Sequence, residues 1–185
     1  MQEKSNISHG IKWGIIIGFV YCILLLVRYT TGASNPIMLG LWAFVGYLAV
    51  LILLLISGFQ LRKFNGGFIE LKEVFKILFL SVLIFEFFYT IFNFVYLKYV
   101  NPGFFQTLKD STEALLLKSN QPQEKIDEMI EKMDAQAAAN MKILDVLKSY
   151  LFSISISGIF ALIFALIIKK KKDPFLTQQD NFLQS

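Results

Sequence analysis

The sequence has very few of the residues on which catalytic and metal sites depend. It contains one cysteine, Cys22, and one histidine, His9, among 185 residues. One cysteine excludes an internal disulfide framework and a zinc site built from cysteine alone. His9 has no companion zinc ligand near it, and Cys22 lies in an apolar run beside no base, which predicts an inert thiol. We therefore expect no metal ion and no other cofactor.

Catalytic motifs are absent as well. The sequence has no Walker loop, no dinucleotide-binding fingerprint and no HExxH motif. The serines of the last apolar run have no histidine at their depth to activate them as nucleophiles. These absences predict a protein that is not an enzyme.

Charged residues are scarce too. They make up 17% of the chain, hydrophobic residues make up 55%, and the mean hydropathy is +0.56. These values differ from those of a soluble domain, so the excess of apolar residues is expected to lie in a lipid bilayer. The net charge of +4 does not indicate a nucleic-acid partner, because the basic residues flank apolar runs and are not interleaved with aromatic residues.

Three apolar runs are long enough to cross a bilayer by themselves, and the first run, Trp13 to Val27, has 15 residues and must recruit flanking residues to span it. The first ends at Arg28, so Lys12 or Arg28 is expected to extend its charge to a membrane interface. A cleaved signal peptide is the alternative for this run, although its length and the later runs favour a retained helix. The chain is thus predicted to be an all-α membrane protein with four transmembrane helices, at about residues 11–30, 37–59, 75–97 and 148–168.

The positions of the basic residues predict the orientation of these helices. Short basic segments mark the cytoplasmic side of a membrane, so both chain ends are expected there, including a polar tail at 175–185. The longer loop at 98–147 is then extracytoplasmic, and residues 1–174 form one domain. The basic residues assigned to the cytoplasmic side are Lys4, Lys12, Arg62, Lys63, Lys72, Lys76 and Lys169 to Lys172.

The loop at 98–147 is predicted to form a helical hairpin that is broken at Asn120 to Pro122. Its second half carries an apolar stripe, which needs a partner: the first half of the loop, another chain or the membrane surface. Because no proline or glycine occurs from Gln123 to Ile156, this helix is expected to continue into the fourth span. The stripe consists of Ile126, Ile130, Met133, Ala137, Met141 and Leu144.

Small residues repeat at every fourth position along the first and fourth spans. Such seams allow two membrane helices to approach closely, so we expect these two spans to pack against each other. The seam residues are Gly10, Gly14 and Gly18 in the first span, and Ser153, Ser157, Ala161 and Ala165 in the fourth.

The third span contains the sharpest candidate for a functional site. One charge, Glu86, lies near the middle of about 30 Å of otherwise apolar helix. Counted at 100° per residue, it shares one polar stripe with Tyr89, Thr90 and Asn93, so its carboxyl group should face protein. Loss of hydration at this depth favours the neutral carboxyl. Hydroxyl partners are expected at similar depth from Tyr21, Tyr47, Ser155 and Ser157.

Two segments resemble a known family. The segment Gly66 to Lys76, GGFIELKEVFK, and the segment Asn93 to Pro102, NFVYLKYVNP, are similar to bacterial four-span membrane proteins catalogued as domain of unknown function 4199. The lysine-rich end of the fourth span is similar too, and the similarity extends from about Ile11 to Pro174. The resemblance implies an inner-membrane protein of a Gram-negative bacterium. It implies no activity, and Glu86 matches no motif of the family.

Glu86 leaves three interpretations open: a hydrogen bond that locks the bundle, an ion or proton site, or a docking point for a cationic helix. No other span supplies a second acid or a counter-ion at its depth. The predicted function is therefore non-enzymatic: a scaffold or accessory protein that meets a membrane-protein partner, or a second copy of itself, through the extracytoplasmic amphipathic helix. The alternative is a small oligomeric carrier or channel that uses Glu86.

Overall fold

The computed structural model describes residues 2–140 and 142–171, and in these ranges the chain is helical. Met141, Lys172 and the tail at 175–185, about which the sequence made predictions, lie outside the described residues. The all-α prediction is confirmed. The helices are α1 (Gln2–Gly32), α2 (Pro36–Phe64), α3 (Leu71–Val95), the π-helical turn η1 (Tyr96–Val100), α4 (Phe104–Lys118), α5 (Gln123–Asn140) and α6 (Ile143–Ile168).

Four of these helices are long and apolar enough to cross a membrane, which indicates a multi-pass membrane protein. Each is longer than the predicted span, because the helix continues past its apolar run into polar residues. The candidate spans are Glu3–Gly32, Pro36–Phe64, Leu71–Val100 and Ile143–Ile168.

Local sequence explains the sharp turns between the first three spans. The Asn35 side chain accepts a hydrogen bond from the Met38 backbone N–H at 3.2 Å and so caps α2, while Pro36 occupies its first turn. Gly66 and Gly67 follow α2 with φ angles of +71° and +86°. Only glycine adopts such angles without strain, so these two residues allow the chain to turn towards α3.

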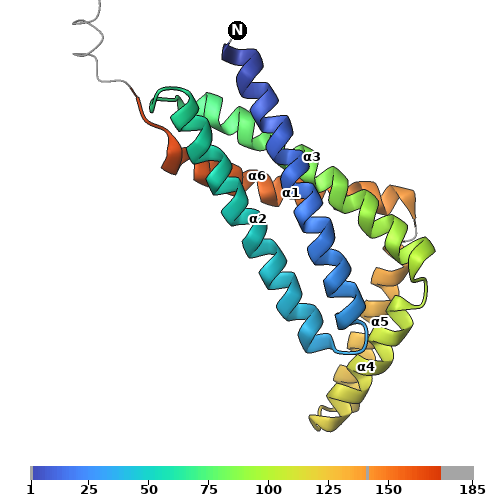
Figure 1. Cartoon of the computed structure of the whole chain (residues 1–185). Helices are drawn as coiled ribbons and strands as arrows, with labels where there is room; N and C mark the ends of the chain where they lie inside the picture. Colours follow the sequence, from blue (N-terminus) through green and yellow to red (C-terminus); the bar gives the residue numbers. More distant parts are fainter. Residues whose placement is uncertain (1, 141, 172–185) are drawn as a thin grey trace, which may run out of the picture.

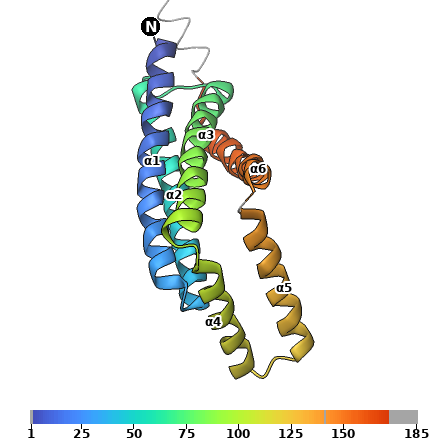
Figure 2. The ribbon, with the colours of Figure 1, turned by 90° about the vertical axis from the view of Figure 1, so that its right-hand side faces the viewer.

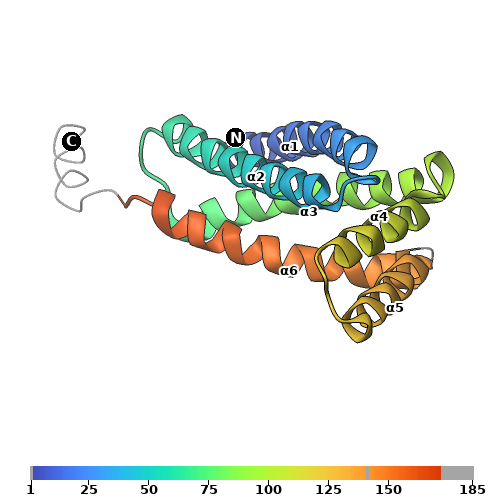
Figure 3. The same cartoon turned by 90° about the horizontal axis from the view of Figure 1, so that it is seen from below.

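Helix α3 lies at the centre of the bundle. Seen from below, α1 and α2 lie on one side of α3 and α6 lies on the other (Figure 3). Its residues Ile77, Leu78 and Val82 are fully buried in the main apolar core, together with Ala161 and Ala165 of α6. α3 is therefore the helix on which the other spans assemble.

The predicted contact between the small-residue seams of the first and fourth spans is wrong, because each seam faces α3. A Cβ atom added to Gly14 would lie 2.7 Å from the Cβ of Ile84. On α6, the hydroxyl group of the seam residue Ser157 donates a hydrogen bond to Glu86 of α3 at 2.6 Å, and a Cβ atom added to its neighbour Gly158 would lie 3.0 Å from the ring of Phe79. The bulky side chains of α3 fill the grooves that small residues leave on both neighbours, so the seams pack against α3 instead of against each other.

The predicted continuous helix from Gln123 into the fourth span is also wrong. α5 ends at Asn140, and Lys142 has an extended backbone, with φ −99° and ψ 126°, before α6 begins at Ile143. Figure 2 shows the two helices running in different directions. α5 packs on α4 whereas α6 packs along α3. Because α5 and α6 pack against different helices, the chain breaks between them even though no proline or glycine occurs there.

The segments that join the spans gather at two opposite ends of the molecule (Figure 1). At one end, which we call the basic end, the start of α1, the α2–α3 loop and the residues after α6 meet. Ile69 and Lys170 form an antiparallel bridge there, and Lys76 pairs with Glu3 at 2.7 Å. The α1–α2 turn and the α4–α5 pair lie at the other end, the hairpin end, where the Ser111 hydroxyl donates to the Ala33 carbonyl at 2.9 Å.

Helices α4 and α5 fold back on each other at the hairpin end (Figure 2). Asn120 has a φ of +51° in the connecting turn, and Lys109 pairs with Asp134 across the two helices at 2.7 Å. Ile126, from the apolar stripe of α5, is 1% exposed. Within the chain, α5 packs on the first half of the loop, which is one of the three partners considered for this stripe.

Candidate functional site

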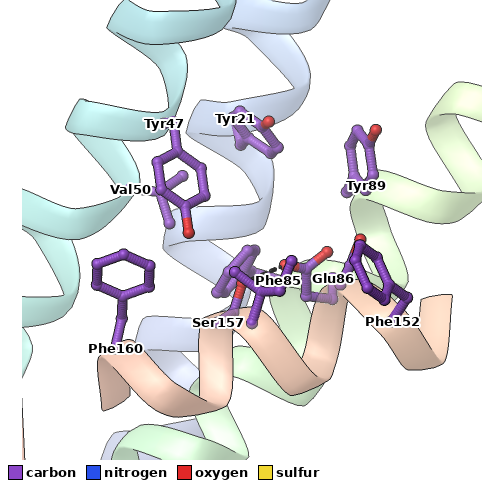
Figure 4. A pocket seen from close by; sticks show the side chains of 11 residues that line it. Tyr21, Tyr47, Val50, Phe85, Glu86, Tyr89, Phe152, Ser157 and Phe160 are labelled. Atoms are coloured by element: carbon purple, nitrogen blue, oxygen red, sulfur yellow. Dashed lines mark hydrogen bonds between the residues drawn. The ribbon is translucent and has the colours of Figure 1, made fainter. Parts of the chain in front are cut away.

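A cavity of about 450 Å³ lies around Glu86, between the four spans (Figure 4). Each span contributes a polar side chain to it: Tyr21 from α1, Tyr47 from α2, Glu86 and Tyr89 from α3, and Ser153 and Ser157 from α6. The remaining walls are apolar and mostly aromatic. They consist of Val50, Phe85, Phe152, Ile156 and Phe160.

The carboxyl group of Glu86 is buried, with 5% of the residue exposed. The Ser157 hydroxyl donates a hydrogen bond to its Oε1 atom at 2.6 Å (Figure 4). Within the described ranges, Oε2 accepts no hydrogen bond and no basic side chain pairs with Glu86. The site therefore presents a carboxyl oxygen that has no protein partner among the described residues.

Aromatic rings surround this carboxyl group. The ring centroids of Tyr21 and Tyr89 lie 5.5 Å apart, and Tyr47 meets Phe160 edge to face at 5.8 Å. The Tyr47 hydroxyl is buried, has no hydrogen bond to another described residue and points towards α6 (Figure 4). An aromatic face attracts cations, so the cavity combines a carboxyl group with several π surfaces.

Three of the four hydroxyl groups predicted at the depth of Glu86 line this cavity, and Ser155 is the exception. Ser155 is exposed, and its hydroxyl donates to the Leu151 carbonyl of its own helix at 2.9 Å. It lies two residues from Ser157, which is about 200° around an α-helix, so the two serines face opposite sides. Ser155 and Ser157 lie at nearly the same depth in the membrane as Glu86, but depth alone does not show which of the two faces it.

The polar stripe predicted on α3 divides between two cavities. Glu86 lines the cavity just described, and Tyr89 lines both this cavity and a second one at the hairpin end. Asn93 lines the second cavity and accepts a hydrogen bond from the Tyr29 hydroxyl. Thr90 is half-buried and lines neither of these two cavities. The stripe thus follows α3 from mid-span to its hairpin end.

The seam residues of α6 have two different roles. Ser153 and Ser157 line the cavity, while Ala161 and Ala165 are fully buried in the core. Gly10, Gly14 and Gly18 of α1 lie against α3, at distances where an added Cβ would come within 3.0 Å of it. These glycines are packing residues.

The sequence did not predict the apolar wall on α6 or the cavity that Arg28 lines. Phe152, Ile156 and Phe160 occur at every fourth position, a spacing that indicates one helix face. Arg28, one of the two basic residues expected at a membrane interface, lines the second cavity together with Tyr29 and Asn93.

His9 lies at the basic end and has a structural partner. Its Nε2 atom lies 3.0 Å from the Ser57 carbonyl oxygen, which links α1 to α2. Among the residues that the structure describes, no three His, Cys, Asp or Glu side chains converge in a way that would hold a metal ion.

Comparison with known proteins gives one match. A family model described as protein of unknown function (DUF4199) matches residues 12–170 of the chain. No curated protein and no solved structure matches it. The match assigns no activity, so a functional interpretation has to come from the geometry of the cavity.

Proposed function

The chain belongs to the DUF4199 family of proteins of unknown function, and we propose that it is a non-enzymatic membrane carrier or binding protein whose ligand site is the Glu86 cavity. The ligand class that fits this cavity is a small amphiphilic cation. The observation that carries this proposal is the Glu86 carboxyl group, which lies at the wall of an aromatic cavity with one hydroxyl donor and no basic partner among the described residues.

An ionisable side chain at bilayer depth is expensive and is typical of a substrate or ion pathway. A hydrogen bond that only locks α3 to α6 requires Glu86 and Ser157 but no adjoining space. Here the carboxyl group adjoins about 450 Å³, a volume typical of small-molecule sites.

The chemistry of the walls favours a cation with apolar substituents. A cation would supply the charge partner that Glu86 lacks, and the rings of Tyr21, Tyr89 and Phe160 would offer their π faces to it. Val50 and Ile156 would contact the apolar part of the ligand. Protons compete for the same carboxylate, so binding of the cation should weaken as the pH falls.

Glu86→Gln tests this proposal directly. We expect the purified full chain to bind tetraphenylphosphonium saturably, and Glu86→Gln to weaken binding about 10- to 100-fold, because glutamine cannot ionise to pair with the bound cation. Isothermal titration in a neutral detergent measures both affinities. The matched control is Glu128→Gln, which alters an exposed acid that pairs with Lys132 on α5. Equal affinity of Glu86→Gln and wild type, with both proteins folded, would remove the carrier interpretation.

The hairpin favours a second role, that of a scaffold or accessory protein. α4 and α5 project beyond the four spans, and Leu117 and Met129 are exposed on them (Figure 2). We place this hairpin on the extracytoplasmic side of a bacterial inner membrane, with both chain ends cytoplasmic, from the charge bias of the loops. A partner membrane protein or a second copy would bind there, and a charge introduced at Met129 should then abolish co-purification of that partner.

A further inference from the structure

A second cavity, of about 240 Å³, lies at the hairpin end, where α1 and α3 meet α4 and α5. Its polar lining includes Arg28, Tyr89, Asn93 and Gln136, and Phe104 and Leu108 of the hairpin lie across it. Tyr89 lines this cavity and the Glu86 cavity, but the two differ in charge. The Glu86 cavity holds an acid, whereas this one holds a guanidinium group.

Arg28 has no anionic partner within the described part of the chain. Its Nε atom is buried without a hydrogen bond, and none of the ion pairs between described residues includes it. Its guanidinium carbon lies 5.7 Å from the centre of the Tyr29 ring. Arg28 is half-buried, and its buried Nε–H group would be satisfied by an acceptor that enters the cavity.

We propose that this cavity binds an oxyanion, a phosphate or carboxylate group, at Arg28. The planar fork of a guanidinium group matches two oxygens of such an anion. The Asn93 carbonyl oxygen already accepts from the Tyr29 hydroxyl, which leaves the Asn93 amide N–H groups as further donors. The N–H groups of Arg28 and Asn93 would both donate hydrogen bonds to the anion and so stabilise its negative charge.

The position of the cavity suggests where the oxyanion comes from. Arg28 lies four residues before the end of α1 at Gly32, and Asn93 lies in the last turn of α3 before η1. The cavity is therefore at the depth where two spans leave the apolar run, which is where phospholipid phosphates lie. A soluble oxyanion that enters from the hairpin side is the other source of the same chemistry.

The test uses the full chain in a neutral detergent, with two probes and two variants. Native mass spectrometry with dioleoyl-phosphatidylglycerol measures retention of a lipid phosphate, and thermal unfolding with inorganic phosphate measures binding of a soluble anion. Arg28→Gln removes the guanidinium group. Lys98→Gln is the matched control, because Lys98 is a basic residue near the same end whose Nζ lies over the Phe94 ring at 4.9 Å, and it does not line the cavity.

We expect wild type to bind one of the two probes saturably, and Arg28→Gln to weaken that binding at least about tenfold, while Lys98→Gln has little effect. Retention of one phosphatidylglycerol molecule identifies a lipid phosphate, and a phosphate-dependent rise in unfolding temperature without lipid retention identifies a soluble anion. Glu86→Gln should leave either result unchanged. A failure of the oxyanion proposal can therefore be distinguished from a failure of the cation proposal.

Equal binding by wild type, Arg28→Gln and Lys98→Gln would overturn the proposal, as would wild-type protein that responds to neither probe. If Arg28→Gln does not fold, Arg28→Lys replaces it. This variant keeps the charge but loses the fork, so an intermediate loss of affinity supports the site and an unchanged affinity contradicts it.

Discussion

The hydroxyl group of Ser157 is the protein's own hydrogen-bond donor to the Glu86 carboxyl group, at 2.6 Å. Both residues are buried, so water does not readily replace this bond if the hydroxyl is lost. A buried acceptor that loses its donor destabilises the folded state by about 1–3 kcal/mol. At the scale of single residues, this bond connects the stability of the α3–α6 contact to the candidate site.

Ser157→Ala should therefore lower the free energy of unfolding by about 1–3 kcal/mol. Ser155→Ala, the same substitution two residues earlier, should change it by less than about 0.5 kcal/mol, because Ser155 is exposed and bonds only to its own helix. Chemical unfolding in mixed detergent micelles measures both values. Equal losses in the two variants would contradict the assignment of Ser157 to the buried bond.

At the scale of elements, α1 approaches α3 closely because three glycines lie on the contact. The Cβ of an alanine at position 14 would overlap Ile84, whereas nothing lies within 4 Å of a Cβ added to Gly40 of α2. The two positions are both helical glycines in membrane spans, but only one is at a helix contact. This contrast separates the packing role of a glycine from its intrinsic effect on a helix.

Gly14→Ala should destabilise the bundle by about 1–3 kcal/mol, because the added methyl group forces α1 away from α3. Gly40→Ala should be neutral or stabilise by up to about 1 kcal/mol, since alanine favours a helix more than glycine does. Thermal unfolding of the two purified variants measures the difference. Equal stability of Gly14→Ala and Gly40→Ala would show that α1 and α3 do not pack through Gly14.

At the scale of the whole molecule, the two ends differ in chemistry. The basic end gathers Arg62, Lys76 and Lys170 with the start of α1, and the hairpin end carries α4 and α5 (Figure 1). Arg62 also donates to the Ile168 carbonyl at 3.3 Å, which connects α2 to the end of α6. Basic segments mark the cytoplasmic side, so the two ends are expected on opposite sides of the membrane.

Cysteine labelling in intact cells tests this orientation. In a Cys22→Ser background, Lys118→Cys on the hairpin should react with a membrane-impermeant maleimide, because it is exposed at the extracytoplasmic end. Lys63→Cys, also exposed but at the basic end, should react only after the membrane is permeabilised. The reverse pattern of labelling would invert the proposed topology.

The sequence by itself determined the four spans, the break in the loop at Asn120 to Pro122, and the presence of an acid in the middle of the third span. These features depend on local properties: the length of an apolar run, the chemistry of one turn and the 100° step of a helix. Such properties are readable along the chain because each involves residues that are neighbours in sequence.

Only the tertiary structure decided which helices meet. It placed α3 between the two small-residue seams, ended α5 before α6, and placed Arg28 at a cavity shared with the hairpin. The physical reason is that helix contacts depend on how side chains far apart in sequence fit together in shape and polarity. The periodicity of small, apolar and polar residues indicates which face of a helix makes a contact. Which helix covers this face depends on how the whole bundle assembles.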